Sequence, residues 1–329
     1  MGGMEKSTIQ YSNLLSTIVN FVGIFASKGF YDNSDILKTR VKRYYPNRPI
    51  SEKSYYLENL IKVLRIIRKE KITHIHYHHR IYILMVFFVK VFFPKIKIIY
   101  SHQNVFDDLL NKMIFADKII TLTKATKNDL PLWLQKKATI IPHGIFIPKN
   151  IASRTSLPQP TQIGYVGRFV EWKGIIGLLS DFAEAKKTVK QIKLTLVGDG
   201  PLLHKINTTI SKLGIRDDVI IINSRHDLTT IYKKIDILVL PSKKLEGFGI
   251  VLIEAMSFGI PVITYNIPTY QDTVIDSYNG ILAEDNIYDA ILRSIKSESK
   301  YILLSKNAKL YSKKYDINKI ILQYLEEIY

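Results

Sequence analysis

The chain has 329 residues, of which 47% are hydrophobic and 23% are charged, with a formal net charge of +18 and no cysteine. This length predicts about two domains. The composition is that of an ordinary globular protein, which argues against a disordered, collagen-like or coiled-coil protein. The lack of cysteine excludes a disulfide scaffold, thiol catalysis and cysteine-ligated zinc. Residues 1–150 carry 24 Lys and Arg against 10 Asp and Glu. This basic half indicates an anionic partner, either nucleic acid or an acidic membrane surface, or else a composition biased toward lysine.

Short β-branched runs alternate with amphipathic stretches along the first half. The predicted strands are residues 72–76, 96–101, 118–122 and 139–142, and apolar spacing predicts a helix over residues 55–69. The apolar stretch Ile81–Phe93 is interrupted by Lys90 and is shorter than the roughly 20 residues that span a bilayer. It predicts a buried or interfacial helix.

The second half repeats this alternation with predicted strands at residues 162–166, 193–197, 219–222, 236–240 and 261–264. Strands that alternate with helices favour parallel βαβ units and an α/β fold. Residues 147–160 contain three prolines among small and polar residues, which predicts a linker with a domain boundary near residue 155. We therefore expect domains at residues 1–155 and 156–312, followed by a helical segment at residues 313–329 that packs back on the first domain.

The strongest motif follows the predicted strand at residues 236–240. Glu246, Gly247, Phe248 and Gly249 occupy a strand-to-helix turn, and the helix begins near Ile250 and ends before the capping Gly259. Ligands of open α/β sheets bind at the carboxyl ends of strands, and a helix N-terminus there favours a phosphate. Within the helix, Glu254 stands in apolar sequence. We expect it to face a polar ligand, because a buried carboxylate is costly unless it is paired.

A second motif follows the predicted strand at residues 162–166. Gly167 and Arg168 end this strand, and Lys173 lies in the turn before the next helix. Two cations at the carboxyl end of a strand are well placed to neutralise a diphosphate. The Gly-rich turn Val197–Pro201 lacks the complete dinucleotide fingerprint, so it predicts a tight turn beside a nucleotide pocket and is weak support for NAD.

Histidines mark two strand ends in the first half. His74, His76 and His78 alternate on one predicted strand, which leaves a structural role or, less readily, a metal site. His102 ends another strand and could equally serve a ligand or the core. The sequence contains neither a Gly-x-Ser-x-Gly elbow nor a phosphate loop, so the hydrolase and P-loop classes are disfavoured.

Together these segments resemble the family-4 (group 1) retaining glycosyltransferases of the GT-B fold, of the bacterial polysaccharide and lipopolysaccharide type. The resemblance is strongest over residues 160–285 and is carried by VGRFVEWKG, VGDGP, DILVLPS and EGFGIVLIEAMSFGIPVI. IIYSHQNV and TIIPHGI extend it more weakly into the first half. The resemblance implies an α/β GT-B architecture of two Rossmann-like domains facing each other across a cleft, with the acceptor on the first and a nucleotide sugar on the second.

The resemblance also implies roles for individual residues. Catalysis would involve His102, Arg168, Lys173 and Glu246. Donor binding would involve Gly2, Gly3, Gly167, Arg168, Lys173, Glu246, Gly247, Phe248, Gly249, Ile250 and Glu254. Family members begin with a short apolar strand before the Gly-rich loop, whereas here Met1 directly precedes Gly2 and Gly3. We therefore expect the native protein to begin several residues upstream.

The resemblance implies transfer of a hexose from a nucleotide sugar, with UDP as the expected carrier, to a glycan or lipid-linked acceptor with retention of configuration. No metal or other cofactor is expected. Lipopolysaccharide, capsule or exopolysaccharide synthesis is the expected pathway, on the inner face of the cytoplasmic membrane, with an anionic membrane surface as partner. The alternatives are a nucleotide-sugar epimerase or phosphorylase of the same fold and, less favoured, a basic nucleic-acid-binding protein.

Overall fold

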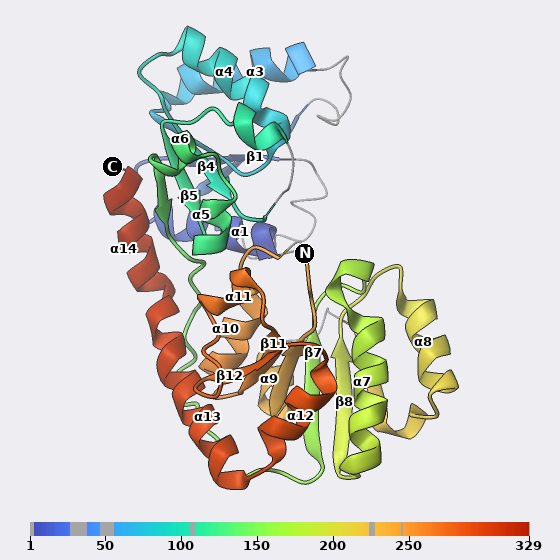
Figure 1. The fold of residues 1–329 in the computed structure, drawn as a ribbon. Coiled ribbons are helices and arrows are strands. Elements are labelled where there is room, and N and C mark those ends of the chain that lie inside the picture. The colour runs from blue at the N-terminus through green and yellow to red at the C-terminus, as the bar shows by residue number, and fades with distance from the viewer. Residues whose placement is uncertain are drawn as a thin grey trace. The chain divides into compact units, whose positions relative to one another are not determined.

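The computed structural model describes residues 3–26, 38–46, 56–105, 109–223, 228–244 and 246–328. Their contacts divide the chain into two compact units, which Figure 1 draws. Unit 1 comprises Met1–Gly144 and Ile320–Tyr329, and unit 2 comprises Ile145–Lys319. The described strands of both units pair in parallel within their sheets, so the predicted α/β fold is confirmed.

The described part of unit 1 has two parallel sheets. One is formed by β1 (Val22–Phe25) and β2 (Val41–Tyr44), and the other has the order β3 (His74–Tyr77), β4 (Lys97–His102), β5 (Lys118–Thr121) and β6 (Ala138–Ile140). Among the residues that the structure describes, the helices in the first segment of unit 1 are α1 (Gly3–Leu15), α3 (Tyr56–Glu70), α4 (Ile83–Phe92), α5 (Lys124–Asn128) and α6 (Leu132–Gln135). Apolar residues of α3 and α4 pack on β4 and β5, because these strands are buried along almost their whole length.

A cavity of about 850 Å³ lies within unit 1 and is lined by residues of both of its sheets. Its walls also include residues of α1, α3 and α4. His76, His78 and His143 line the cavity, and burial lowers the pKa of His78 to about 4 and that of His143 to about 3. These imidazoles are therefore neutral near pH 7.

The last helix, α14 (Ile317–Ile328), begins in unit 2 and ends in unit 1. Its apolar face forms one core cluster with the strands of unit 1, made of Ile99, Ile120, Ile141, Ile320, Ile321 and Tyr324. The Tyr324 hydroxyl is hydrogen-bonded to the His76 imidazole, and Lys118 forms a 3.1 Å ion pair with Glu327. Helix α14 thus supplies part of the core of unit 1.

Unit 2 is built on one six-stranded parallel sheet with the order β12 (Gly280–Ala283), β11 (Val262–Tyr265), β10 (Ile237–Leu240), β7 (Thr161–Val166), β8 (Ile192–Val197) and β9 (Val219–Ile222). The connecting helices are α7 (Ile175–Thr188), α8 (Leu203–Lys212), α9 (Leu228–Lys234), α10 (Ile250–Ser257), α11 (Pro268–Gln271), α12 (Ile287–Ile295) and α13 (Glu298–Ser312). Helices lie on both faces of this sheet (Figure 1), as apolar strands such as β10 and β11 require.

The proline-rich segment predicted as a linker packs against unit 2. Ile145 forms a parallel bridge with Asp316, the Arg154 backbone N–H donates to Ser305 Oγ at 2.7 Å, and the Arg154 guanidinium donates to the Ile235 carbonyl at 2.7 Å. These bonds explain why the division between the units falls after Gly144, ahead of the boundary expected near residue 155. Among the described helices, none has the length and apolarity needed to cross a membrane.

Candidate active site

The turns after β7 and β10 carry the motif residues predicted in unit 2. These two strands are hydrogen-bonded neighbours, with Ile237 opposite Ile163 and Leu238 opposite Gly164. From β7 the chain builds outward through β8 and β9, and it then returns to the other side of β7 to form β10. Such a reversal of strand order opens a crevice at the carboxyl ends of the strands, where α/β proteins bind their ligands.

Arg168 projects from the turn that directly follows β7. Its side chain is exposed and its guanidinium stacks over the Trp172 ring, 5.3 Å from the ring centroid. The Tyr165 hydroxyl donates to the Arg168 carbonyl at 2.8 Å and fixes the backbone below the side chain. The next turn packs closely here, since a Cβ on Gly198 would lie 2.0 Å from the Gly167 carbonyl oxygen. These contacts fix the backbone of Gly167 and Arg168, while the Arg168 guanidinium is exposed to solvent.

Lys173 and Glu246 form an ion pair that joins the two turns. Lys173 ends a short 3₁₀ segment, and Gly174 follows with a φ of +70°. A Cβ on Gly174 would lie 2.2 Å from the Pro241 carbonyl oxygen, so only glycine allows this approach of the two turns. The side chains of Lys173 and Glu246 are 16% and 11% exposed.

Burial and the nearby Arg168 charge lower the pKa of Lys173 to about 8. The Glu246 carboxylate acts in the opposite direction, because an adjacent anion favours the charged ammonium. An anionic ligand that reached this point would likewise favour the ammonium.

The Glu246 turn leads directly into α10. Phe248 is buried, and Gly249 adopts a φ of +72° at the N-cap, where a Cβ would approach the Tyr270 ring to 2.9 Å. Ile250 is the first helical residue, as predicted, and Gly259 has the left-handed φ of +69° expected of the cap. The first backbone N–H groups of a helix have no partner within it, so this end of α10 offers donors to an anion.

Glu254 lies one turn further along α10 and is 9% exposed. The Tyr232 hydroxyl from α9 donates to its carboxylate at 2.9 Å. Sequence reasoning predicted that this carboxylate faces a polar ligand, which stays a prediction. It did not predict the bond from Tyr232, because nothing in the sequence places α9 beside α10. The Glu254 carboxylate and the Tyr232 hydroxyl thus share one buried hydrogen bond near the same crevice.

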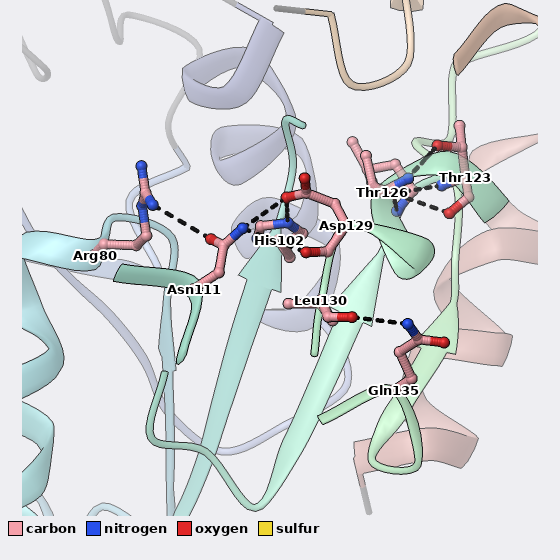
Figure 2. Close-up of polar contacts among 9 residues, drawn as sticks. Arg80, His102, Asn111, Thr123, Thr126, Asp129, Leu130 and Gln135 are labelled. Atoms are coloured by element: carbon pink, nitrogen blue, oxygen red, sulfur yellow. Dashed lines mark hydrogen bonds and ion pairs between the residues drawn. The ribbon is translucent and has the colours of Figure 1, made fainter. Parts of the chain in front are cut away.

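In unit 1, His102 anchors a chain of polar side chains that Figure 2 shows. Its imidazole is fully buried at the end of β4, and its Nε2 is hydrogen-bonded to Asp129 Oδ2 at 2.8 Å. Asn111 Nδ2 donates to the same carboxylate oxygen at 2.8 Å, and Arg80 Nη1 donates to Asn111 Oδ1 at 3.3 Å. Asp129 and Asn111 were not predicted, since single polar residues outside a recognisable motif give no signal of their own.

The capping of α5 places Asp129 opposite His102. Thr123 Oγ1 accepts from the Thr126 backbone N–H at 3.1 Å, and the Thr126 side chain accepts in turn from the Thr123 backbone. This reciprocal cap fixes the start of α5, and Asp129 ends the same short helix. Gln135 Nε2 donates to the Leu130 carbonyl at 2.7 Å and secures the turn that follows (Figure 2).

The remaining predicted residues of unit 1 take other places. Gly3 is the first residue of α1, and Gly2 lies outside the described residues. His76 is hydrogen-bonded to Ser101 at 2.7 Å and His78 to Gln103 at 3.0 Å. Within the described ranges, no group of three or more His, Asp and Glu side chains is arranged to hold a metal ion.

Comparison with known proteins identifies the family. The family model "Glycosyl transferases group 1" matches residues 147–313, half of the chain. The chain belongs to the group 1 glycosyl transferases. This glycosyltransferase is 27% identical over 344 residues to an uncharacterised glycosyltransferase of Haemophilus influenzae, covering 97% of this chain and 94% of the relative. It is 33% identical over 135 residues to the capsular polysaccharide biosynthesis glycosyltransferase CapM of Staphylococcus aureus, covering 41% and 35%.

Solved structures confirm that the glycosyltransferase has the predicted GT-B fold. The crystal structure of HepE from Anabaena, in complex with UDP and glucose, superposes with a TM-score of 0.82 at 19% identity. The match covers 99% of this chain and 95% of HepE. Lys173, Glu246 and the start of α10 lie together in unit 2, and His102 belongs to a hydrogen-bonded group within unit 1.

Proposed function

We propose that this glycosyltransferase transfers a hexose from a nucleotide sugar to a glycan or lipid-linked acceptor, with retention of configuration and without a metal ion. The observation that carries the proposal is the meeting of Arg168, the Lys173–Glu246 pair and the N-terminus of α10 at the carboxyl ends of β7 and β10. Cations and free backbone donors at such a crevice suit a departing nucleoside diphosphate. A UDP carrier is supported by the UDP in HepE.

In this proposal the reaction exchanges one C–O bond for another. The acceptor oxygen forms a bond to the anomeric carbon, the bond from that carbon to the donor phosphate breaks, and the acceptor proton leaves with the diphosphate. Arg168 and Lys173 stabilise the negative charge that develops on the phosphate in the transition state. Stabilisation of such developing charge is usually the largest contribution to the rate. Glu246 contacts the transferred sugar, Glu254 holds the ribose hydroxyls, and His102 contacts the sugar from unit 1.

The test is a screen of UDP-hexoses with lipid-linked sugar acceptors, followed by NMR of the product. We expect UDP release that requires an acceptor, and a new glycosidic bond with the anomeric configuration of the donor. Inversion at the anomeric carbon would contradict retention. Conversion of the donor without acceptor would favour an epimerase, and phosphate-dependent cleavage of a glycan would favour a phosphorylase.

The pH dependence of UDP binding tests the role of Lys173. Its ammonium is charged below its pKa, which burial and Arg168 lower to about 8, so affinity should fall as the pH rises through that region. Arg168→Ala removes the like charge and should move this fall to higher pH, whereas Glu246→Gln removes the favourable anion and should move it to lower pH. Calorimetric titration of UDP between pH 6 and 10 measures these midpoints. Identical midpoints in all three proteins would exclude Lys173 as the titrating group.

The pathway and location also belong to the proposal. We place the enzyme in cell-surface polysaccharide synthesis, supported by its similarity to CapM, and at an anionic membrane surface on the inner face of the cytoplasmic membrane. In α4, the side chains of Leu84, Phe87, Val91 and Phe92 are 44–61% exposed. Residues 71–105 contain five Lys and Arg and no Asp or Glu. The exposed apolar side chains of α4 and the basic residues around it in the sequence are the features that favour binding to a membrane surface rich in anionic lipid.

Charged substitutions on α4 test this membrane surface. Phe87→Asp with Val91→Asp should reduce co-sedimentation with phosphatidylglycerol vesicles several-fold, because it removes apolar contact and adds negative charge. The matched control is Leu303→Asp with Leu310→Asp on α13, whose side chains are both 55% exposed. Equal losses in the two variants would refute the assignment of α4. Equal binding of the unmodified protein to phosphatidylcholine vesicles would refute the preference for anionic lipid.

A further inference from the structure

The chain passes between the two units at Gly144–Ile145 and again at Lys319–Ile320. On the unit 2 side, the segments next to these passages pair with each other. The Ile145 backbone N–H donates to the Tyr315 carbonyl at 2.8 Å, and the Ile317 backbone N–H donates to the Ile145 carbonyl at 2.9 Å. Ile145 is 3% exposed and Ile317 is fully buried. Backbone hydrogen bonds therefore join the segments next to the two passages into one buried pair.

The side chain of Tyr315 extends from this paired structure to the Glu246 turn. Its ring lies edge-on to Phe248, with 5.6 Å between the ring centroids and an interplanar angle of 62°. Its hydroxyl donates to the Asp272 carbonyl at 3.2 Å, directly after α11. Tyr315 thus contacts three segments that are distant in sequence: the first passage, the Glu246 turn and the end of α11.

The Glu246 turn depends on such an anchor because glycines stand on both sides of Phe248. Gly247 and Gly249 permit many backbone conformations, and the buried Phe248 side chain selects one of them. Glu246 precedes this anchor and α10 follows it, so a displaced Phe248 ring would move the carboxylate paired with Lys173 and the first donors of α10. Small displacements of groups that position a substrate have large effects on rate.

We propose that Tyr315 is a positioning residue for the donor site. The Tyr315 ring holds the Phe248 ring in place, and Phe248 in turn fixes the position of the Glu246 turn. The turn is thereby tied to the paired segments next to the two passages between the units. The proposal rests on the proposed function, in which the Glu246 turn binds the nucleotide sugar. Tyr315 acts through Phe248 and does not itself touch the donor.

Tyr311 provides a matched control. Its hydroxyl donates to the same Asp272 carbonyl at 2.9 Å, its ring lies 5.9 Å from the Tyr315 ring, and it is 9% exposed against 7% for Tyr315. Of these two tyrosines, Tyr315 is the one whose ring pairs with Phe248. A leucine at either position therefore removes the bond to Asp272, but only Tyr315→Leu removes the anchor of the turn.

The experiment compares UDP affinity, donor KM, kcat and thermal midpoint for Tyr315→Leu, Tyr315→Phe and Tyr311→Leu. We expect both leucine variants to lose similar thermal stability. Only Tyr315→Leu should raise the donor KM and the UDP dissociation constant, by about five- to tenfold, with a lower kcat and an unchanged acceptor KM. Tyr315→Phe keeps the ring and should restore the donor KM to that of the unmodified protein.

Two further outcomes are decisive. The proposal is overturned if Tyr311→Leu weakens UDP binding as much as Tyr315→Leu, or if Tyr315→Leu binds UDP as the unmodified protein does. A Phe248→Leu, Tyr315→Leu double variant should weaken UDP binding no more than the stronger single variant, because both changes break one contact. If the unmodified protein neither binds UDP nor uses a UDP-sugar, the proposed function fails first and the role of Tyr315 falls with it.

Discussion

Replacing Arg168 by alanine should lower kcat/KM for sugar transfer by about 10²- to 10³-fold, as expected when one group that stabilises transition-state charge is removed. The guanidinium is exposed and stacks over the Trp172 ring. The Arg168 backbone keeps its bond from the Tyr165 hydroxyl whatever the side chain. The thermal midpoint should therefore remain close to that of the unmodified protein. Steady-state kinetics with thermal unfolding on the same preparation measures both quantities.

Lys205→Ala is the control for Arg168→Ala. Lys205 is also a solvent-exposed cation of unit 2, 56% exposed, and it forms a 3.1 Å ion pair with Glu171. It lies on α8, so its removal should leave transfer almost unchanged. Loss of activity in both variants would point to a general effect of positive charge on unit 2. Full activity in Arg168→Ala would remove Arg168 from the catalytic group.

Replacing Glu254 by alanine should weaken UDP binding by about 10- to 100-fold, because hydrogen bonds to a charged group contribute about 1.5–3 kcal/mol. The carboxylate is nearly buried, so the change also leaves the Tyr232 hydroxyl without the partner it has in the folded protein. We therefore expect a lower thermal midpoint alongside the weaker binding. Calorimetric titration at a temperature where the variant is fully folded separates the two effects.

Tyr232→Phe distinguishes a ligand-binding role of Glu254 from a structural one. This substitution breaks the 2.9 Å hydrogen bond but leaves the carboxylate in place. If Glu254 binds the donor ribose, Tyr232→Phe should retain most of the UDP affinity that Glu254→Ala loses. Equal losses in the two variants would show that Glu254 acts by holding α9 and α10 together, and would remove it from the donor site.

The sequence predicted the elements of unit 2 more completely than those of unit 1. Strongly apolar strands such as β8 and β10 give a clear pattern because they are buried within the sheet. The missed strands are short and carry weak patterns: β1 contains Gly23, β2 has two exposed basic residues, and β12 begins with Gly280. A strand of four residues that contains a glycine or two adjacent charges cannot be distinguished from a loop.

The composition of the donor turns was predictable, but their pairing was not. Arg168, Lys173 and Glu246 each follow a predicted strand, which places them at the carboxyl edge of the sheet. That Lys173 meets Glu246 depends on β10 lying beside β7, and strand order cannot be deduced from apolar periodicity. The same holds for His102, because only the folded chain shows that Asp129 and Asn111 share its hydrogen-bonded group.

The passage of α14 into unit 1 has a consequence for synthesis of the protein. Unit 2 is one continuous segment and has all of its residues once Lys319 has left the ribosome. Unit 1 is translated first, yet its cluster around Ile99 and Ile120 stays incomplete until Ile320, Ile321 and Tyr324 emerge. Nascent domains usually fold in the order in which they are made. Here the last segment of the earlier unit is translated after the whole of the later unit, so the apolar surface around Ile99 and Ile120 stays uncovered until α14 has been made.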